Sequence, residues 1–297
     1  MRISCIISQA DSASMNIWQH LQQMFPWEAV QLDHPEDRLC ILPVQAFQAD
    51  IGDHRLSAYV YAEESVYLER IDRAFSSDYL IFCTKHQAKS GIPSLSVHTQ
   101  GNFGTADFGG QARTLAPSPA LLLATAYDAL KRQAALCELD YDVVYEVTHH
   151  GPAVETPSMF IEIGSDARRW QDQQAGAVVA SALYQVLADD AFSDHHVFSA
   201  LPAIIGFGGL HTCPSFVKLV DREQALLGHI CPGYRLSDLD EAMVQQMIEK
   251  THPAPVAAVL DWKGLKKEKQ RVISLLEKVA IPVYRTKDFS DGKNPLS

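Results

Sequence analysis

The residues in this chain best suited to chemistry are histidines at the ends of predicted strands. His149 and His150 follow a β-branched run and precede Gly151-Pro152, which forces a turn. Adjacent side chains of a continuous strand point to opposite faces, but this break can bring both imidazoles onto one loop. Neutral imidazole binds metal ions and transfers protons near pH 7, so the pair indicates a metal or acid–base site.

A carboxylate and further histidines occupy other strand ends. Glu162 stands in the apolar strand Ser158–Gly164, where an unpaired charge is costly, so we expect it to meet a cation, a metal or a hydrogen-bond donor. His86 and His98 each end a predicted strand, and His211 lies in a glycine-rich loop. Three or four N/O ligands plus one open position suit a catalytic zinc. The set is compatible with zinc, although it lacks the compact H-E-x-x-H spacing.

The other histidines and the cysteines are interpreted structurally. His229 is expected to be a polar residue in a tight glycine turn. Surface positions are expected for His20, His34, His54, His195, His196 and His252. Without any C-x-x-C pair, buried packing roles are expected for Cys5, Cys40, Cys83 and Cys231. Cys213 is kept as a weak site candidate because it lies in the same loop as His211.

The elements that must position these residues alternate between short β-branched runs and helical patterns. Strands are predicted at 1–8, 38–44, 57–62, 78–84, 93–98, 141–148, 158–164, 202–206, 255–261 and 282–285, and helices at 14–24, 119–136, 166–187, 237–250 and 265–279. This alternation predicts an α/β fold with a mixed, mostly parallel sheet and helices on both faces. Ligands of such sheets bind at the loops after the strands. Without a linker or repeat, we predict one catalytic domain over residues 1–297.

Composition excludes several classes of protein. The chain has 297 residues, of which 47% are hydrophobic and 21% charged, as in soluble globular proteins. No apolar run approaches the length of a membrane span, and the N-terminus resembles a strand more than a signal peptide, so we expect a cytoplasmic protein without a membrane partner. The net charge of −11 argues against broad binding to nucleic acid, including DNA. Residues 263–271 offer only a local basic patch.

Several of these segments, in this order, resemble the archaeal and plant type of D-aminoacyl-tRNA deacylase. The resembling stretches are EVTHHGP (146–152), PSMFIEIGS (157–165), GFGGLHTCP (206–214), GHICPGY (228–234), DWKG (261–264), HTQGNFGTADFGG (98–110), Lys85-His86 with Lys89, and ASMNI (13–17). Two positions depart from the family pattern. Thr212 follows His211 where the family usually has an aromatic residue, and Lys85 stands where it usually has arginine.

The resemblance implies a zinc-binding hydrolase that cuts the ester of D-aminoacyl-tRNA, with a fold similar to the peptidyl-tRNA hydrolase and nucleoside phosphorylase class. The expected metal ligands are drawn from His86, His98, His149, His150 and Glu162. The expected catalytic residues are His149, His150, His211 and Glu162. Substrate contacts are expected from Lys85, Lys89, Asn102, Gly208, Gly209 and Lys263, with the N–H groups of the two glycines facing the oxyanion. The sequence does not separate ligand from base within this set.

Two alternatives stay open at the level of sequence. A metal-dependent amidase or peptidase acting on a small molecule suits the acidic net charge better, and competition by tRNA for the site would distinguish the two enzymes. A non-catalytic tRNA-binding or metal-storage protein would bind tightly without turnover. That second alternative leaves the clustering of histidines at strand ends unexplained.

Overall fold

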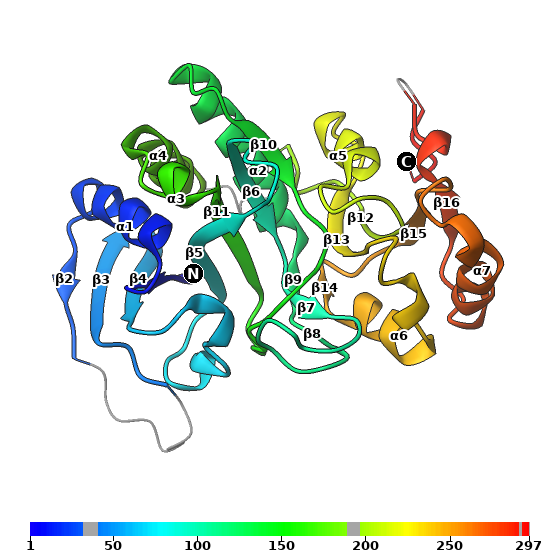
Figure 1. The fold of residues 1–297 in the computed structure, drawn as a ribbon, viewed down its shortest axis with the longest axis horizontal. Coiled ribbons are helices and arrows are strands. Elements are labelled where there is room, and N and C mark those ends of the chain that lie inside the picture. Colours follow the sequence, from blue (N-terminus) through cyan, green and yellow to red (C-terminus); the bar gives the residue numbers. More distant parts are fainter. Residues whose placement is uncertain (32–40, 189–196, 291–292, 297) are drawn as a thin grey trace.

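The computed structural model describes residues 1–31, 41–188, 197–290 and 293–296 and contains two sheets side by side (Figure 1). The larger sheet has the order β10-β6-β11-β5-β1-β4-β3-β2. Its strands are β1 (Arg2–Ser8), β2 (Glu28–Ala29), β3 (Gln45–Ile51), β4 (His54–Tyr61), β5 (Tyr79–Gln87), β6 (Ser94–His98), β10 (Asp142–Tyr145) and β11 (Ser158–Ser165). Pairing is parallel except between β11 and β6, β3 and β4, and β2 and β3.

The smaller sheet is wholly parallel, in the order β13-β12-β15-β16. It consists of β12 (Ala203–Phe207), β13 (Leu226–Cys231), β15 (Ala257–Leu260) and β16 (Val283–Arg285). Two short pairs complete the strands: β7 (Gly101–Asn102) with β8 (Thr114–Leu115), and β9 (Ser118–Pro119) with β14 (Thr251–His252). The loop after β10 joins the two sheets, because Thr148 N donates to Ile230 O at 3.1 Å and Val147 N to His211 O at 3.0 Å.

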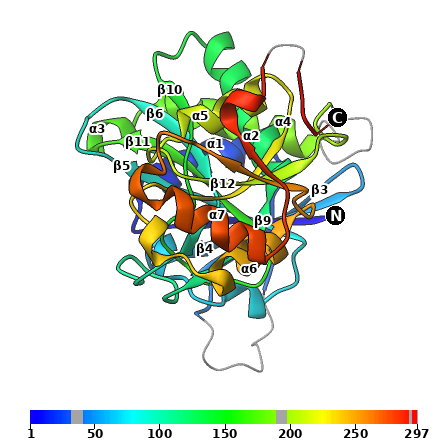
Figure 2. The same ribbon diagram turned by 90° about the vertical axis from the view of Figure 1, so that its right-hand side faces the viewer.

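Helices cover the sheets unequally. The larger sheet carries α1 (Ser12–Met24), α2 (Ala120–Leu136), α3 (Ala167–Trp170) and α4 (Gln173–Ala188) on one face. Its other face is covered by η1 (Ser65–Tyr67), η2 (Ile71–Arg73) and loops, through buried residues such as Leu68. The smaller sheet packs against α5 (Pro214–Asp221) on one face and against α6 (Glu241–Glu249) and α7 (Lys269–Lys278) on the other (Figure 2). The remaining short helices are η3 (Leu236–Asp238), η4 (Lys266–Glu268) and η5 (Thr286–Asp288).

The α/β prediction with a mostly parallel sheet is confirmed, and the differences are local. The helix predicted over 166–187 is divided into α3 and α4, because Asp172 Oδ1 accepts from Gln174 N at 3.0 Å and starts a new helix. The helix predicted from Ser237 begins at Glu241, because Asp240 caps it by accepting from Met243 N at 3.0 Å. Of the strand predicted over 38–44, residues 38–40 lie outside the described ranges, and 41–44 are not in a strand.

The main hydrophobic core contains residues of both sheets, such as Ile161 of β11 and Ile204 of β12. The assignment of residues 1–297 to one domain stays a prediction. Within the described ranges, none of the helices has both the length and the apolar character needed to cross a bilayer.

Candidate metal and catalytic centre

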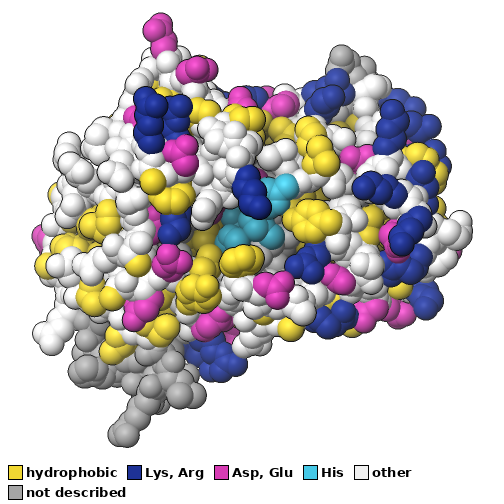
Figure 3. Space-filling view, in the orientation of Figure 1, with side chains coloured by type: hydrophobic (Ala, Val, Ile, Leu, Met, Phe, Trp, Pro, Cys, Tyr) yellow, Lys and Arg dark blue, Asp and Glu magenta, His cyan; other side chains and the backbone are white. Residues whose placement is uncertain are grey.

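The histidines predicted at separate strand ends come together at one site. His86 and His98 come from β5 and β6, His149 and His150 from the loop after β10, and His211 from the loop after β12. The ring centroid of His149 lies 4.1 Å from the ring centroid of His98, 4.4 Å from that of His150 and 4.5 Å from that of His211. Figure 3 shows histidine side chains reaching the surface at the centre of this face. The expected convergence is therefore observed.

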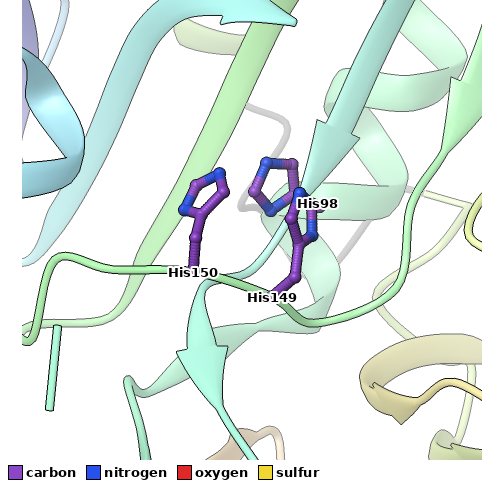
Figure 4. Close-up of side chains that lie close together, drawn as sticks. All are labelled: His98, His149 and His150. Atoms are coloured by element: carbon purple, nitrogen blue, oxygen red, sulfur yellow. The ribbon is translucent and has the colours of Figure 1, made fainter. Parts of the chain in front are cut away.

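Three of the rings form what we call the imidazole group: His98, His149 and His150 (Figure 4). Each Nδ1 lies within hydrogen-bond distance of a backbone carbonyl oxygen. The three oxygens belong to Thr99, Val147 and Gly151, at 3.1, 2.8 and 2.6 Å. A carbonyl oxygen only accepts, so each Nδ1 carries a proton and each Nε2 is left to bind another partner. One ring nitrogen from each histidine lies within 4.8 Å of the others.

Burial keeps two members of the imidazole group neutral. Together with neighbouring imidazoles, burial lowers the pKa of His149 well below its ordinary value and that of His150 to about 4. The loop is held in place by a close approach, since a Cβ on Gly151 would meet Gly110 N at 2.1 Å. His150 itself has φ 42°, a left-handed conformation that surrounding contacts must maintain.

The other half of the site is the carboxylate group, made of His86, Glu146, Glu162 and His211. His86 Nδ1 lies 3.2 Å from Glu146 Oε1 and 3.4 Å from Glu162 Oε2. Glu162 also accepts from Thr84 Oγ1 at 2.9 Å and from Ser96 Oγ at 3.1 Å. Glu162 therefore meets the donors and the imidazoles that its burial predicts.

Charge within the carboxylate group is set by these pairings. Burial raises the pKa of Glu146 and Glu162, but hydrogen bonds from imidazoles outweigh it and leave both pKa values below their ordinary range. Burial lowers the pKa of His86, but the two carboxylates raise it to about 9. His98 bridges the two groups, because its Nε2 lies 3.6 Å from Glu162 Oε1. Burial lowers the pKa of His98, but Glu162 outweighs it and the net direction is upward.

Sequence reasoning missed Glu146, which is 1% exposed and faces three histidines of the site. It precedes Val147 and follows the buried Tyr145. The argument that singled out Glu162, a carboxylate amid apolar neighbours, applies to it equally.

His211 connects the centre to solvent. Its Nε2 lies 3.0 Å from Glu146 Oε2 and its Nδ1 3.2 Å from the Tyr234 hydroxyl, which belongs to a half-exposed side chain. Tyr234 therefore places an aromatic hydroxyl beside His211. Sequence reasoning did not select Tyr234, although it ends one of the resembling stretches.

Two cavities meet at His149, His150 and Phe108. The smaller, of about 240 Å³, includes Asn102 in its lining. The larger, of about 810 Å³, includes Lys85 and Lys89. Lys85 Nζ is neutralised there by Glu64 Oε1 at 2.7 Å, whereas Lys89 is exposed and has no ion-pair partner among the described residues. Three predicted substrate-binding residues therefore line the space around the centre.

The other three predicted substrate-binding residues, Gly208, Gly209 and Lys263, lie outside both cavity linings. Gly208 N donates to Cys231 O at 2.8 Å, so the expectation that it faces an oxyanion is wrong. Gly209 packs against Gly264, where a Cβ would meet Gly209 N at 2.2 Å. This contact fixes the exposed Lys263 beside the His211 loop rather than shaping an oxyanion site.

Two further interpretations are corrected. His229 is not in a glycine turn but fully buried in β13, where its Nδ1 lies 3.1 Å from Thr148 Oγ1 and burial lowers its pKa to about 3. Cys213 is buried and donates to Tyr145 O at 3.2 Å, so it packs rather than faces the site.

The remaining histidine and cysteine predictions divide by location. Burial is confirmed for Cys5, Cys83 and Cys231. His252 is exposed, while His20 and His54 are partly exposed. The residues outside the described ranges are His34, Cys40, His195 and His196.

Comparisons with known proteins agree on one family. A family model for D-aminoacyl-tRNA deacylase matches residues 74–284, which include all five histidines of the centre. A relative from Methanosarcina mazei is 34% identical over 98% of this chain and 94% of its own length, and one from Pyrococcus abyssi is 30% identical over 91% and 94%. Both are named D-aminoacyl-tRNA deacylase.

A solved structure supports the fold. The crystal structure of a conserved protein of unknown function covers 99% of this chain and 98% of its own, with a TM-score of 0.82 and 23% identity. At that identity the likeness concerns the fold alone, and membership follows from the family match and the two relatives. The chain therefore belongs to the D-aminoacyl-tRNA deacylase family.

Proposed function

We propose that this deacylase cuts the ester of D-aminoacyl-tRNA at the centre described above, with zinc held by the imidazole group, and releases the D-amino acid and free tRNA. The reaction, hydrolysis of an aminoacyl ester, follows from family membership. The location of the chemistry rests on one observation: three Nδ1–H groups are committed to backbone carbonyls, which leaves the Nε2 atoms to bind a metal, and one ring nitrogen of each histidine lies within 4.8 Å of the others.

The donor set of the imidazole group fits zinc. His98 Nε2 is buried without a hydrogen-bond partner among the described residues, and two buried carboxylates nearby favour a cation. Three nitrogen ligands with an open position are a recurring catalytic zinc arrangement, and the hydrogen-bonded Nδ1 atoms are typical of metal-binding histidines. Bound there, zinc polarises the ester carbonyl and acidifies water.

Two further sets of side chains also bring possible ligand atoms together, His86 with Glu146 and His211, and His98 with both carboxylates. In the first set the imidazoles already pair with Glu146. In the second set both oxygens of Glu162 already accept hydrogen bonds, from Thr84 and from Ser96. We therefore assign His86 and Glu162, both predicted as ligands, to charge balance around the metal.

The carboxylate group supplies proton transfer. Glu146 holds the His211 ring through Nε2, so Nδ1 is the nitrogen that faces the Tyr234 hydroxyl and the open side of the site. His211 can take a proton from the attacking water and return one to the ribose oxygen that leaves. Such a relay needs an imidazole with one fixed nitrogen and one accessible nitrogen, and His211 fits because its side chain is 37% exposed.

The tRNA must approach an acidic protein, so local basic residues matter. We assign Lys89 and Lys263 to backbone phosphates, and Lys85 and Asn102 to the cavity walls that hold the aminoacyl end. Residues 261–297 carry nine of the 25 Lys and Arg residues and five acidic residues, which makes this end of the chain basic while the whole carries −11. We place the protein in the cytoplasm, where a tRNA-directed enzyme finds its substrate.

The test compares matched D- and L-aminoacyl-tRNA with and without a chelator, alongside zinc content by mass spectrometry. We expect hydrolysis of the D-ester only, with loss of activity and of bound zinc on chelation. His149→Ala or His150→Ala should abolish deacylation while circular dichroism shows an intact fold. Full activity of the zinc-free protein would reject the metal assignment. Hydrolysis of small amides that tRNA does not inhibit would favour the small-molecule amidase.

A further inference from the structure

Phe108 is an exposed aromatic side chain at the junction of the two cavities. Its side chain is 68% exposed and lines both cavities together with His149 and His150. No aromatic ring among the described residues packs against it. Because it lines both cavities, this exposed ring offers an apolar face to any ligand that enters them.

The loop that carries Phe108 is fixed in position. Phe108 O accepts from Gly151 N at 2.9 Å, which ties the loop to the residue next to His150. The Glu69 carboxylate accepts from Gly110 N on one side and from Ala153 N on the other. Gly109 has φ 67°, and a Cβ there would meet a backbone oxygen at 1.7 Å. The backbone that carries the ring is therefore fixed beside the His150 loop.

Other exposed aromatic side chains surround the same opening. Tyr67 is 50% exposed and lines the larger cavity, whereas Tyr234 is 57% exposed and lines the smaller one. Hydrophobic side chains lie around the histidines on this face (Figure 3). Unpaired bases bind proteins by stacking on such aromatic faces, because every base offers a π-surface.

We propose that Phe108 is the stacking platform for the base of the terminal adenosine of tRNA, an inference that rests on the proposed function. The ester to be cut is attached to the ribose of that nucleotide, so the base must lie within one nucleotide of the histidines. Phe108 is joined to the His150 loop by a direct hydrogen bond and faces the larger cavity, which has room for a nucleoside. The contact recognises the tRNA end and leaves the amino acid to the rest of the site.

The test uses three substrates with the same D-amino acid: the aminoacyl-tRNA, the aminoacyl-adenosine and the ethyl ester. In Phe108→Ala we expect KM for the two adenosine-containing substrates to rise roughly tenfold to a hundredfold, the range of lost base stacking. Hydrolysis of the ethyl ester and zinc content should stay as in the wild type. Phe108→Trp should restore KM and Phe108→Leu should not.

Tyr184→Ala is the matched control, because Tyr184 is 45% exposed but lies on α4, outside both cavity linings; it should behave as wild type. An unchanged KM for the two adenosine substrates in Phe108→Ala would overturn the proposal. So would an equal loss on the ethyl ester, which would place Phe108 against the amino acid, or full rescue by Phe108→Leu. Failure of the proposed function is separate, since the wild type would then cleave none of the three substrates.

Discussion

Histidine has opposite roles in the imidazole group and in the carboxylate group. In the imidazole group each Nδ1–H points at a backbone carbonyl, and burial holds the pKa of His150 at about 4. In the carboxylate group His86 faces two carboxylates, and its pKa rises to about 9 despite burial. The partner of the ring, more than its burial, decides whether histidine is a neutral ligand or a cation.

His98 belongs to both halves and shows what a metal would change. Its Nδ1–H is committed to Thr99 O, while its Nε2 faces Glu162. Without metal, the buried Glu162 carboxylate favours a proton on Nε2, because it raises the pKa of His98. Metal binding displaces such protons, so zinc uptake at this centre should release a proton to solvent.

The largest expected effect on activity and zinc content distinguishes the imidazole group from the carboxylate group. His150→Ala should lose bound zinc and lower kcat/KM by about 10³-fold or more if the imidazole group holds the proposed zinc, because the change removes one of its three nitrogen ligands. His86→Ala should keep its zinc and lose less activity. Zinc content and kcat/KM on D-aminoacyl-tRNA measure both. If His86→Ala lost zinc and His150→Ala kept it, the ligands would instead come from the carboxylate group.

Proton transfer by His211 gives the next largest effect. His211→Ala should lower kcat by roughly 10²-fold or more at unchanged zinc content, the usual contribution of general acid–base catalysis. Tyr234→Phe, which removes only the hydroxyl 3.2 Å from Nδ1, is the milder companion and should cost a few-fold. Steady-state kinetics across pH checks the role, since loss of kcat without any change in the pH profile would contradict it.

The contrast between the halves also explains what the sequence could predict. Residue types and predicted strands were enough to collect the five histidines and Glu162. They did not show that β5 and β6 run in opposite directions on either side of β11, where Glu162 pairs with Thr84 and with Ser96. They could not separate ligand from acid–base residue, because that division depends on backbone carbonyls such as Val147 O, which has no signature in sequence. Glu146 was within reach of the same burial argument that found Glu162.

Two other predictions failed for the same reason, because they too depended on tertiary contacts that have no signature in the sequence. The glycines at 208 and 209 suggested exposed N–H groups, but Gly208 N is taken by a carbonyl of the neighbouring strand β13. His229 lies between Gly228 and Ile230, and its glycine suggested a turn, whereas Gly228 lets Thr251 approach within 2.2 Å of where a Cβ would stand. Glycine indicates close approach as readily as a turn, and only tertiary contacts decide between them.

The pH dependence of stability in the metal-free protein tests whether the carboxylates raise the pKa of His86. A histidine whose pKa is raised on folding adds stability that is complete below the unfolded value of 6.5 and is lost as pH rises through the folded value. The contribution of His86 to the free energy of unfolding is therefore lost between pH 6.5 and about pH 9. The whole contribution is about 3 kcal/mol. Denaturant unfolding of zinc-free wild type and His86→Ala should show a stability difference that shrinks from pH 6 to pH 9.5. An unchanged difference would mean that the ring is already neutral at pH 6.

The smallest expected effects lie at the basic residues outside the centre. Lys89→Ala and Lys263→Ala should each weaken binding of D-aminoacyl-tRNA a few-fold and reduce the slope of log K against log salt by about 0.7 to 0.9, the loss of one phosphate contact. Neither change should affect D-aminoacyl-adenosine, which has no phosphate. Lys131→Ala is the matched control, because Lys131 is paired with Asp221 at 2.6 Å and lies outside both cavity linings. A slope that falls equally in all three variants would show that tRNA senses only the net charge of the protein, and that the catalytic centre alone selects its substrate.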